Sequence, residues 1–186
     1  MSPSHLAVKY KNRGFRRGFT LVELLTVVAI TGILAAIGVM LVRKHFQEAK
    51  SGEAVAIIQA IRSAQEARRA ETGTYQNCST TSGTPWYPAT PDGTLRAWKF
   101  SHPDADRWAA LDISRPEGTR FGFLTNAGNP GTAVTVPVTA SKPTWGTPSD
   151  PWYVIQAAGD RDNDSTLSLF VAASFNGELY TEKDGE

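Results

Sequence analysis

The chain has 186 residues and a formal net charge of +1. This length allows one domain and an anchor, and the near-neutral balance gives no indication of a nucleic-acid partner, which requires clustered cations. The single cysteine, Cys78, excludes an internal disulfide. We expect its thiol to be partly buried, with pairing to another molecule as the alternative.

The N-terminal segment, residues 1–18, carries positive charges and no acidic residue, and an uncharged apolar run follows at residues 24–42. Because cytoplasmic flanks of membrane helices are enriched in Lys and Arg, we expect the N-terminus to face the cytoplasm. The rest of the chain then faces the periplasm or the outside. The cations before the run are Lys9, Lys11, Arg13, Arg16 and Arg17, and Arg43 and Lys44 follow it.

The apolar run is long enough to cross a bilayer, because a helix over residues 24–42 measures about 28 Å. One carboxylate, Glu23, stands at its start. An ionisable group at this place costs about 2–3 kcal/mol unless it is paired or reaches the interface, so Glu23 needs a partner. Residues 20–23 (TLVE) also form a capping box, in which Glu23 caps the helix start.

The pattern in residues 13–42 combines Gly18, Phe19, Thr20, Leu21, Glu23 and Leu24 with residues 28–30 (VAI) and residues 32–37 (GILAAI). It resembles the class III signal of type IV pilins, minor pilins and type II secretion pseudopilins, and a looser likeness extends to Tyr75. The resemblance implies cleavage between Gly18 and Phe19 by a prepilin peptidase and N-methylation of the Phe19 amine. It also implies residence in the bacterial inner membrane, then assembly with other pilin subunits through Phe19 and Glu23.

The apolar run also has two simpler interpretations, which stay open. An ordinary secretory signal peptide would be cut after small residues such as Ala35 and Ala36, but the helical pattern continues beyond them. A generic single-pass anchor would account for the hydrophobicity, but for neither the Gly18–Phe19 junction nor Glu23. We therefore expect a prepilin.

The likeness to major pilins ends after Ile37, where a proline often follows in that family. Residues 38–41 (GVML) hold none. We therefore expect a minor pilin that assembles into a pilus filament, with a type II secretion pseudopilin as the alternative. An alternative from another class is a membrane-anchored periplasmic binding module that never polymerises.

Helical periodicity continues past the apolar run, because Ala54, Ile57, Ile58, Ile61 and Ala64 fall on one helix face. We predict one helix over residues 20–71, about 78 Å long, with Gly73 as a left-handed cap. The predicted parts are a leader at 1–18, a transmembrane and filament-core half-helix at 19–43, an amphipathic half-helix at 44–74 and a globular head at 75–186.

The sequence pattern of the head predicts an α+β fold, in which the long N-terminal helix packs on a small antiparallel sheet of three or four strands. Residues 75–99 are expected to be a polar loop anchored by Trp86, Tyr87 and Trp98. The expected elements are a helical turn at 107–113 that enters a strand, strands at 120–125, 134–138 (an edge or a loop, because of Pro137), 152–158 and 167–174, and a strand at 178–181 after an Asn176-Gly177 turn.

The only metal-like motif lies at residues 160–165 (DRDNDS), between two predicted strands. Asp160, Asp162 and Asp164 alternate on a tight loop and can converge on calcium. The EF-hand pattern fails, because Ser165 replaces its glycine and Val171 replaces its bidentate glutamate. A polar turn is the alternative. The resemblance also allows calcium, since some pseudopilin heads bind it in a C-terminal loop.

No enzyme is expected, because His5, His45 and His102 form no Ser/His/Asp or Cys/His pattern in the sequence. The five tryptophans favour a packed core, with an adhesive aromatic surface as the alternative. They are Trp86, Trp98, Trp108, Trp145 and Trp152.

Overall fold

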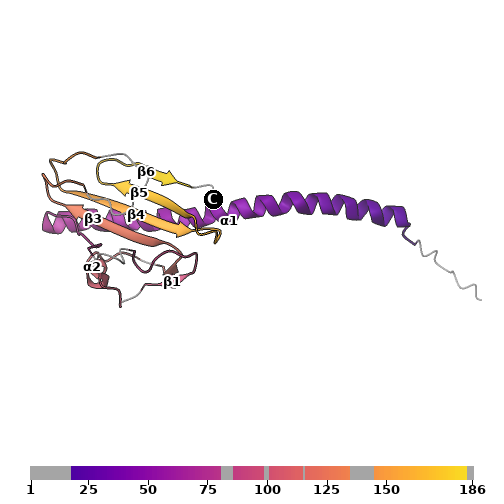
Figure 1. The fold of residues 1–186 in the computed structure, drawn as a ribbon, viewed down its shortest axis with the longest axis horizontal. Coiled ribbons are helices and arrows are strands. Elements are labelled where there is room, and N and C mark those ends of the chain that lie inside the picture. Colours follow the sequence, from indigo (N-terminus) through magenta and orange to yellow (C-terminus); the bar gives the residue numbers. More distant parts are fainter. Residues whose placement is uncertain (1–17, 81–85, 99–100, 115, 135–144, 184–186) are drawn as a thin grey trace, which may run out of the picture. The chain divides into compact units, whose positions relative to one another are not determined.

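The computed structural model describes residues 18–80, 86–98, 101–114, 116–134 and 145–183. The chain divides into two compact units, Met1–Arg43 and Lys44–Glu186, and each unit is described by itself. Helix α1 (Leu21–Thr72) contributes its first part to one unit and its second part to the other (Figure 1).

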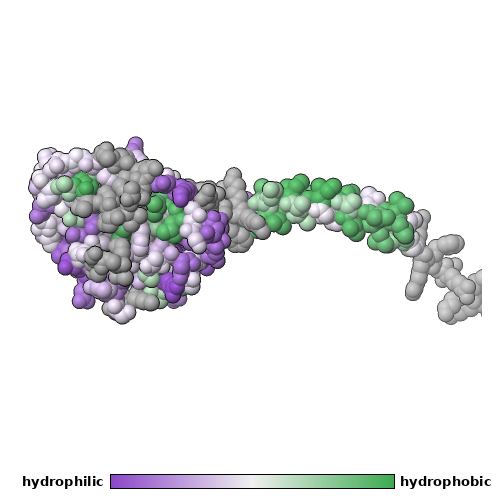
Figure 2. Space-filling model, viewed as in Figure 1, coloured by the Kyte–Doolittle hydropathy of each residue, from purple (hydrophilic) through white to green (hydrophobic). Residues whose placement is uncertain are grey.

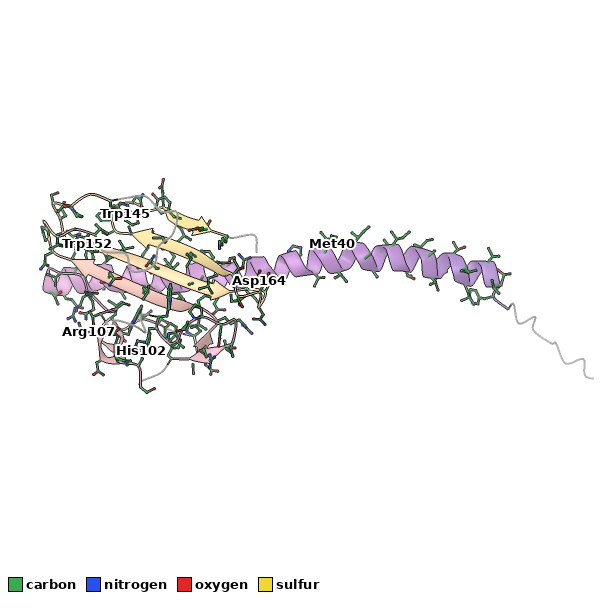
Figure 3. All side chains as sticks on the ribbon, viewed as in Figure 1. Met40, His102, Arg107, Trp145, Trp152 and Asp164 are labelled. Carbon is green, nitrogen blue, oxygen red and sulfur yellow. The ribbon has the colours of Figure 1, made fainter. Side chains whose placement is uncertain are left out.

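In the first unit, α1 is apolar on all sides from Leu21 to Val42. The segment Leu21–Val42 has a mean hydropathy of 2.6, and Figure 2 shows apolar colour along it. It is long and apolar enough to cross a membrane, and its side chains project outward, as Met40 does in Figure 3. The hydroxyls of Thr26 and Thr31 donate to backbone carbonyls within the helix, each at 2.8 Å, so these polar groups need no outside partner.

The second unit is built on an antiparallel sheet in the order β3-β4-β5-β6, so each strand pairs with its neighbour along the chain (Figure 1). A smaller sheet pairs β1 (Arg96–Ala97) with β2 (Gly118–Thr119), and α2 (Ala105–Ala109) lies between them in sequence. This arrangement confirms the predicted α+β class. The main strands are β3 (Gly122–Gly128), β4 (Trp152–Asp160), β5 (Leu167–Ala173) and β6 (Leu179–Glu182).

One face of this sheet packs on the second part of α1. The predicted helix face is confirmed, because Ala54, Ile57, Ile58 and Ile61 are all buried in one core with sheet side chains. Burying each large apolar side chain stabilises the fold by about 1.5–3 kcal/mol. The sheet contributes side chains that alternate along its strands: Phe123, Tyr153, Ile155, Ala157, Phe170 and Ala172.

Strand β4 is buried along its whole length, because side chains also cover the other face of the sheet. Trp86, from the loop before β1, packs with Leu124 and Ala158. Trp145, from the segment before β4, packs on a cluster that includes Trp152 and Val154. Loop tryptophans therefore complete the second layer of the head.

Polar side chains on the second part of α1 bind backbone groups of the loops around the sheet. We call Lys50, Glu53, Arg62 and Gln65 the polar ties. The bonds run from Lys50 Nζ to the Arg161 carbonyl, from the Arg120 N–H to Glu53 Oε1 (3.1 Å), from Arg62 to the carbonyls of Gly177 (3.2 Å) and Glu178 (2.8 Å), and in both directions between Gln65 and the Gln76 backbone (2.8 Å each).

One predicted strand is wrong, and another lies mostly outside the described residues. The strand expected at the end of residues 107–113 is absent from this described stretch, because Asp112 adopts a φ of +47° and turns the chain. Most of the predicted strand at 134–138 lies outside the described residues. The helix ends at Thr72, and Gly73 takes the predicted left-handed conformation with a φ of +78°.

Candidate functional site

The Gly18–Phe19 junction lies in non-helical backbone immediately before α1. Both residues are exposed, and Phe19 retains 75% of its accessible surface. A Cβ added at Gly18 would meet no atom of the chain within 4 Å. The junction is therefore accessible, and this chain itself does not restrict the size of residue 18.

The start of α1 is closed by the predicted capping box. The N–H of Glu23 donates to Thr20 Oγ1 at 3.2 Å, and the N–H of Thr20 donates to Glu23 Oε2 at 3.5 Å. The N–H of Leu24 donates to the Thr20 carbonyl at 3.2 Å. The Glu23 carboxylate thus lies over the helix N-terminus. It contacts Thr20, the residue that follows Phe19, whose amine cleavage would expose.

The side chains expected to join subunits are exposed in the single chain. Leu24, Leu25, Val28, Ile33 and Leu34 each keep more than half of their surface accessible. Their backbone groups are paired within the helix, so covering this surface leaves no polar backbone group unsatisfied. Lipid or other apolar helices can therefore cover it.

The Asp160 loop joins β4 to β5 and brings the three predicted aspartates together. One oxygen from each of Asp160, Asp162 and Asp164 lies within 4.8 Å of the others. Asp160 is buried at the end of β4, while Asp162 and Asp164 are exposed, as Asp164 is in Figure 3. Such a cluster is the kind of oxygen set that calcium prefers.

The same carboxylates also hold the turn together. Asp160 accepts hydrogen bonds from the N–H groups of Asn163 (2.7 Å) and Ser165 (3.0 Å), two residues with positive φ. The N–H of Thr166 donates to Asp164 at 2.6 Å, and this bond lowers the pKa of the Asp164 carboxyl. Each carboxylate oxygen has a second lone pair, so the polar turn and a metal site are compatible.

Another loop, not foreseen as part of this region, lies against the Asp160 loop. A Cβ added at Gly93, whose φ is +73°, would stand 2.0 Å from Asn163 Oδ1. Between the two loops is an open cavity of about 400 Å³, lined by Asp92, Asp160 and Leu167 among others. The Asp92-Gly93 pair is a turn signal in the sequence, but nothing local places it beside residues 160–165.

Cys78 is completely buried rather than partly buried as predicted. Its Sγ lies 3.6 Å from the Arg107 carbonyl, and burial raises the pKa of the thiol to about 12. A buried thiol that stays protonated is a poor nucleophile, so this environment disfavours the alternative of pairing with another molecule.

The aromatic side chains divide between core and surface. Trp86, Trp108 and Trp152 are buried, which confirms a core role for these three. Trp145, labelled in Figure 3, is partly buried. Its ring lies 5.7 Å from that of Phe175, which is exposed. His102 accepts a hydrogen bond from the Asp104 N–H at 3.1 Å, so it takes part in a turn. His5 lies outside the described residues.

The fold and the helix start together define an α+β protein whose N-terminal helix is long and apolar enough to cross a membrane. Residues 11–39 match the family model of the prokaryotic N-terminal methylation motif, which is the signature of type IV pilins and pseudopilins. The chain thus carries the N-terminal signature of that family. No curated protein and no solved structure matches the chain.

Proposed function

We propose that this chain is a type IV pilin-like structural subunit, in particular a minor pilin, that enters a pilus filament. One observation carries the proposal: the methylation motif at residues 11–39 contains the Gly18–Phe19 junction, a helix start capped by Glu23 and most of a segment whose apolar surface is exposed. Each of these features has a use in a subunit that leaves the membrane to join other helices.

The proposed sequence of events begins with cleavage by a prepilin peptidase. Hydrolysis of the Gly18–Phe19 peptide bond releases residues 1–18 and leaves a positively charged amine at Phe19, which is then N-methylated. In an apolar setting that charge attracts a carboxylate strongly, and an unpaired charge there is costly. Glu23 of the same or a neighbouring subunit is the proposed partner, and the pair sets the axial register of the added subunit.

The apolar side chains of the helix supply most of the remaining cohesion in this proposal. Contacts between the exposed residues of segments such as Leu21–Val42 in neighbouring subunits replace contacts with lipid.

A pseudopilin of a type II secretion system is the second candidate. The feature that favours it is the Asp160 loop, whose three aspartates form a candidate calcium site. Bound calcium would stabilise a C-terminal half that cannot form an internal disulfide. The two candidates differ in location, because a pilus reaches the cell surface and a pseudopilus stays in the periplasm.

The test is to compare sheared surface filaments with membranes of cells that express the chain. We expect the protein in both fractions, with an intact mass that lacks residues 1–18 and includes one methyl group. A mature protein beginning beyond Ala36 would identify an ordinary signal peptide and contradict the proposal. Absence from sheared filaments, together with correct processing, would favour a pseudopilin or a non-polymerising anchored module.

A further inference from the structure

The second unit has an open cavity of about 560 Å³ beside the C-terminal end of α1. Four segments that are distant in sequence build it. Arg69 comes from the last turn of α1, Tyr75 from the loop after it, Asp150 from residues 148–151 before β4, and Phe175 from the turn after β5. This volume is within the range of small-molecule sites in proteins.

Hydrogen bonds fix the walls of this cavity. The Gly131 N–H donates to the Pro148 carbonyl at 2.8 Å, and Ser174 binds Tyr153 through both its N–H (3.0 Å) and its Oγ (3.1 Å). The Tyr75 hydroxyl lies 2.9 Å from Arg69 Nη1 and 3.0 Å from a carboxylate oxygen of Glu66. Walls held in this way lose little further freedom when a ligand binds.

The cavity presents an aromatic surface to solvent. In the described residues of the second unit, Leu95 and Phe175 are the exposed large apolar side chains, and Phe175 lines this cavity. Its ring is backed by Trp145 at a centroid distance of 5.7 Å, and the Tyr75 ring is held edge-on by Tyr153 at 4.7 Å. The electron-rich faces of such rings attract the weakly positive C–H groups of a ligand.

The polar groups of the cavity carry no net charge and include both donors and acceptors of hydrogen bonds. The lining includes one cation, Arg69, and one anion, Asp150. The guanidinium only donates hydrogen bonds, the carboxylate only accepts them, and the hydroxyls of Ser149 and Ser174 do both. One cation and one anion leave the lining without net charge, so a ligand without net charge that both donates and accepts hydrogen bonds suits it best.

We propose that this cavity binds a neutral carbohydrate. A pyranose ring offers an apolar C–H face, which suits Phe175, and neighbouring hydroxyls, which suit paired bonds to the Asp150 carboxylate and the Arg69 guanidinium. The inference goes beyond filament assembly and does not depend on it, because every residue it uses belongs to the second unit.

The experiment is saturation-transfer NMR on the mature full chain in a micelle of a sugar-free detergent, lauryldimethylamine oxide. The probes are maltotriose, cellotriose and chitotriose, with trigalacturonic acid as a charged comparison. We expect transfer to the pyranose C–H protons of at least one neutral trisaccharide. Asp150→Asn and Phe175→Ala should weaken that binding about tenfold, since each removes one main contact.

Two matched variants, Asp106→Asn and Leu95→Ala, change an exposed aspartate and an exposed apolar residue outside the cavity and should bind as wild type does. Phe175→Tyr keeps an aromatic face and should also bind, which separates loss of the ring from loss of folding. Absence of transfer to all three neutral sugars would overturn the proposal. Undiminished binding by Asp150→Asn and Phe175→Ala, or stronger binding of trigalacturonic acid, would overturn it too.

Discussion

Glu23 has two roles that substitution can separate. Its carboxylate accepts the Thr20 N–H at the helix start, and in the proposed filament it also pairs with the Phe19 amine. We expect Glu23→Ala to be inserted, cleaved and folded in its head, yet to enter filaments poorly, because an unpaired amine in an apolar setting is costly. The measurement is the ratio of subunit in sheared filaments to subunit in membranes.

Glu23→Gln is the matched control for the helix cap. The amide oxygen still accepts a hydrogen bond from the Thr20 N–H, but the negative charge is gone. If charge pairing drives assembly, Glu23→Gln should fail as Glu23→Ala does. Normal incorporation of both variants would show that the carboxylate only caps the helix.

Cys78 should be inert in the folded protein. Because burial raises the pKa of its thiol to about 12, almost no thiolate is present near neutral pH, and the sulfur is inaccessible. We expect a maleimide reagent to label Cys78 in denaturant and to leave the native chain unlabelled, as read by intact mass. Above the ordinary pKa of a thiol, Cys78 ionises in the unfolded chain but not in the folded one. The free energy of unfolding should therefore fall as the pH rises through this region. Rapid native labelling would mean that the site opens.

At the scale of elements, the polar ties bind loops to α1 through hydrogen bonds. Arg62 allows the clearest test of their contribution to stability. Its guanidinium donates to the Gly177 and Glu178 carbonyls in the turn between β5 and β6. These bonds are exposed, so we expect Arg62→Ala to lower the free energy of unfolding by only about 1 kcal/mol. Urea unfolding of the full chain in detergent measures this change.

Arg68→Ala is the matched control, because Arg68 accepts the Thr72 hydroxyl through its backbone carbonyl, which the substitution keeps. The free energy of unfolding of Arg68→Ala should be nearer to that of the wild type than the free energy of unfolding of Arg62→Ala is. Hydrogen exchange gives a second measurement, in which Arg62→Ala should expose amides of β6 before those of β4. Equal stability of the two variants would mean that the hairpin is held by its apolar contacts alone.

Calcium binding by the Asp160 loop stays a prediction. If calcium binds the folded state at a hundredfold excess over its dissociation constant, it adds about 2.7 kcal/mol of stability, or roughly 5–10 °C in melting temperature. The comparison is the full chain in detergent with calcium and with chelator. Asp162→Ala should abolish the shift and Asp106→Ala should retain it. An equal melting temperature in calcium and chelator would leave the polar turn as the sole role of the loop.

Contiguous patterns were predicted from the sequence better than distant ones. The α1 face from Ala54 to Ile61 and strands β4 and β5 follow from local periodicity. The two-residue strands β1 and β2 have no such period and depend on pairing across the chain. The Asp160 loop was foreseen because its aspartates adjoin in sequence, whereas the cavity with Arg69 and Phe175 depends on packing of four segments.

At the scale of the whole molecule, the first unit holds the segment proposed to cross the membrane, and the second unit has a core of its own. A charge in the apolar segment should therefore alter location without altering the core of the head. Lysine at the centre of a membrane helix costs about 2.5–3.5 kcal/mol. We expect Ile33→Lys to reduce the carbonate-resistant membrane fraction, with Ile33→Leu as the control. Equal membrane retention would contradict a transmembrane role for Leu21–Val42.

The capped start of α1 has a consequence for a subunit that waits in the bilayer. Because the Glu23 carboxylate already accepts a hydrogen bond from the Thr20 N–H, it would be held close to the Phe19 amine before the subunit joins a filament. A side chain that is already held in place loses less conformational freedom when it pairs with a charged amine. The helix cap would thus prepare the carboxylate for the proposed pair.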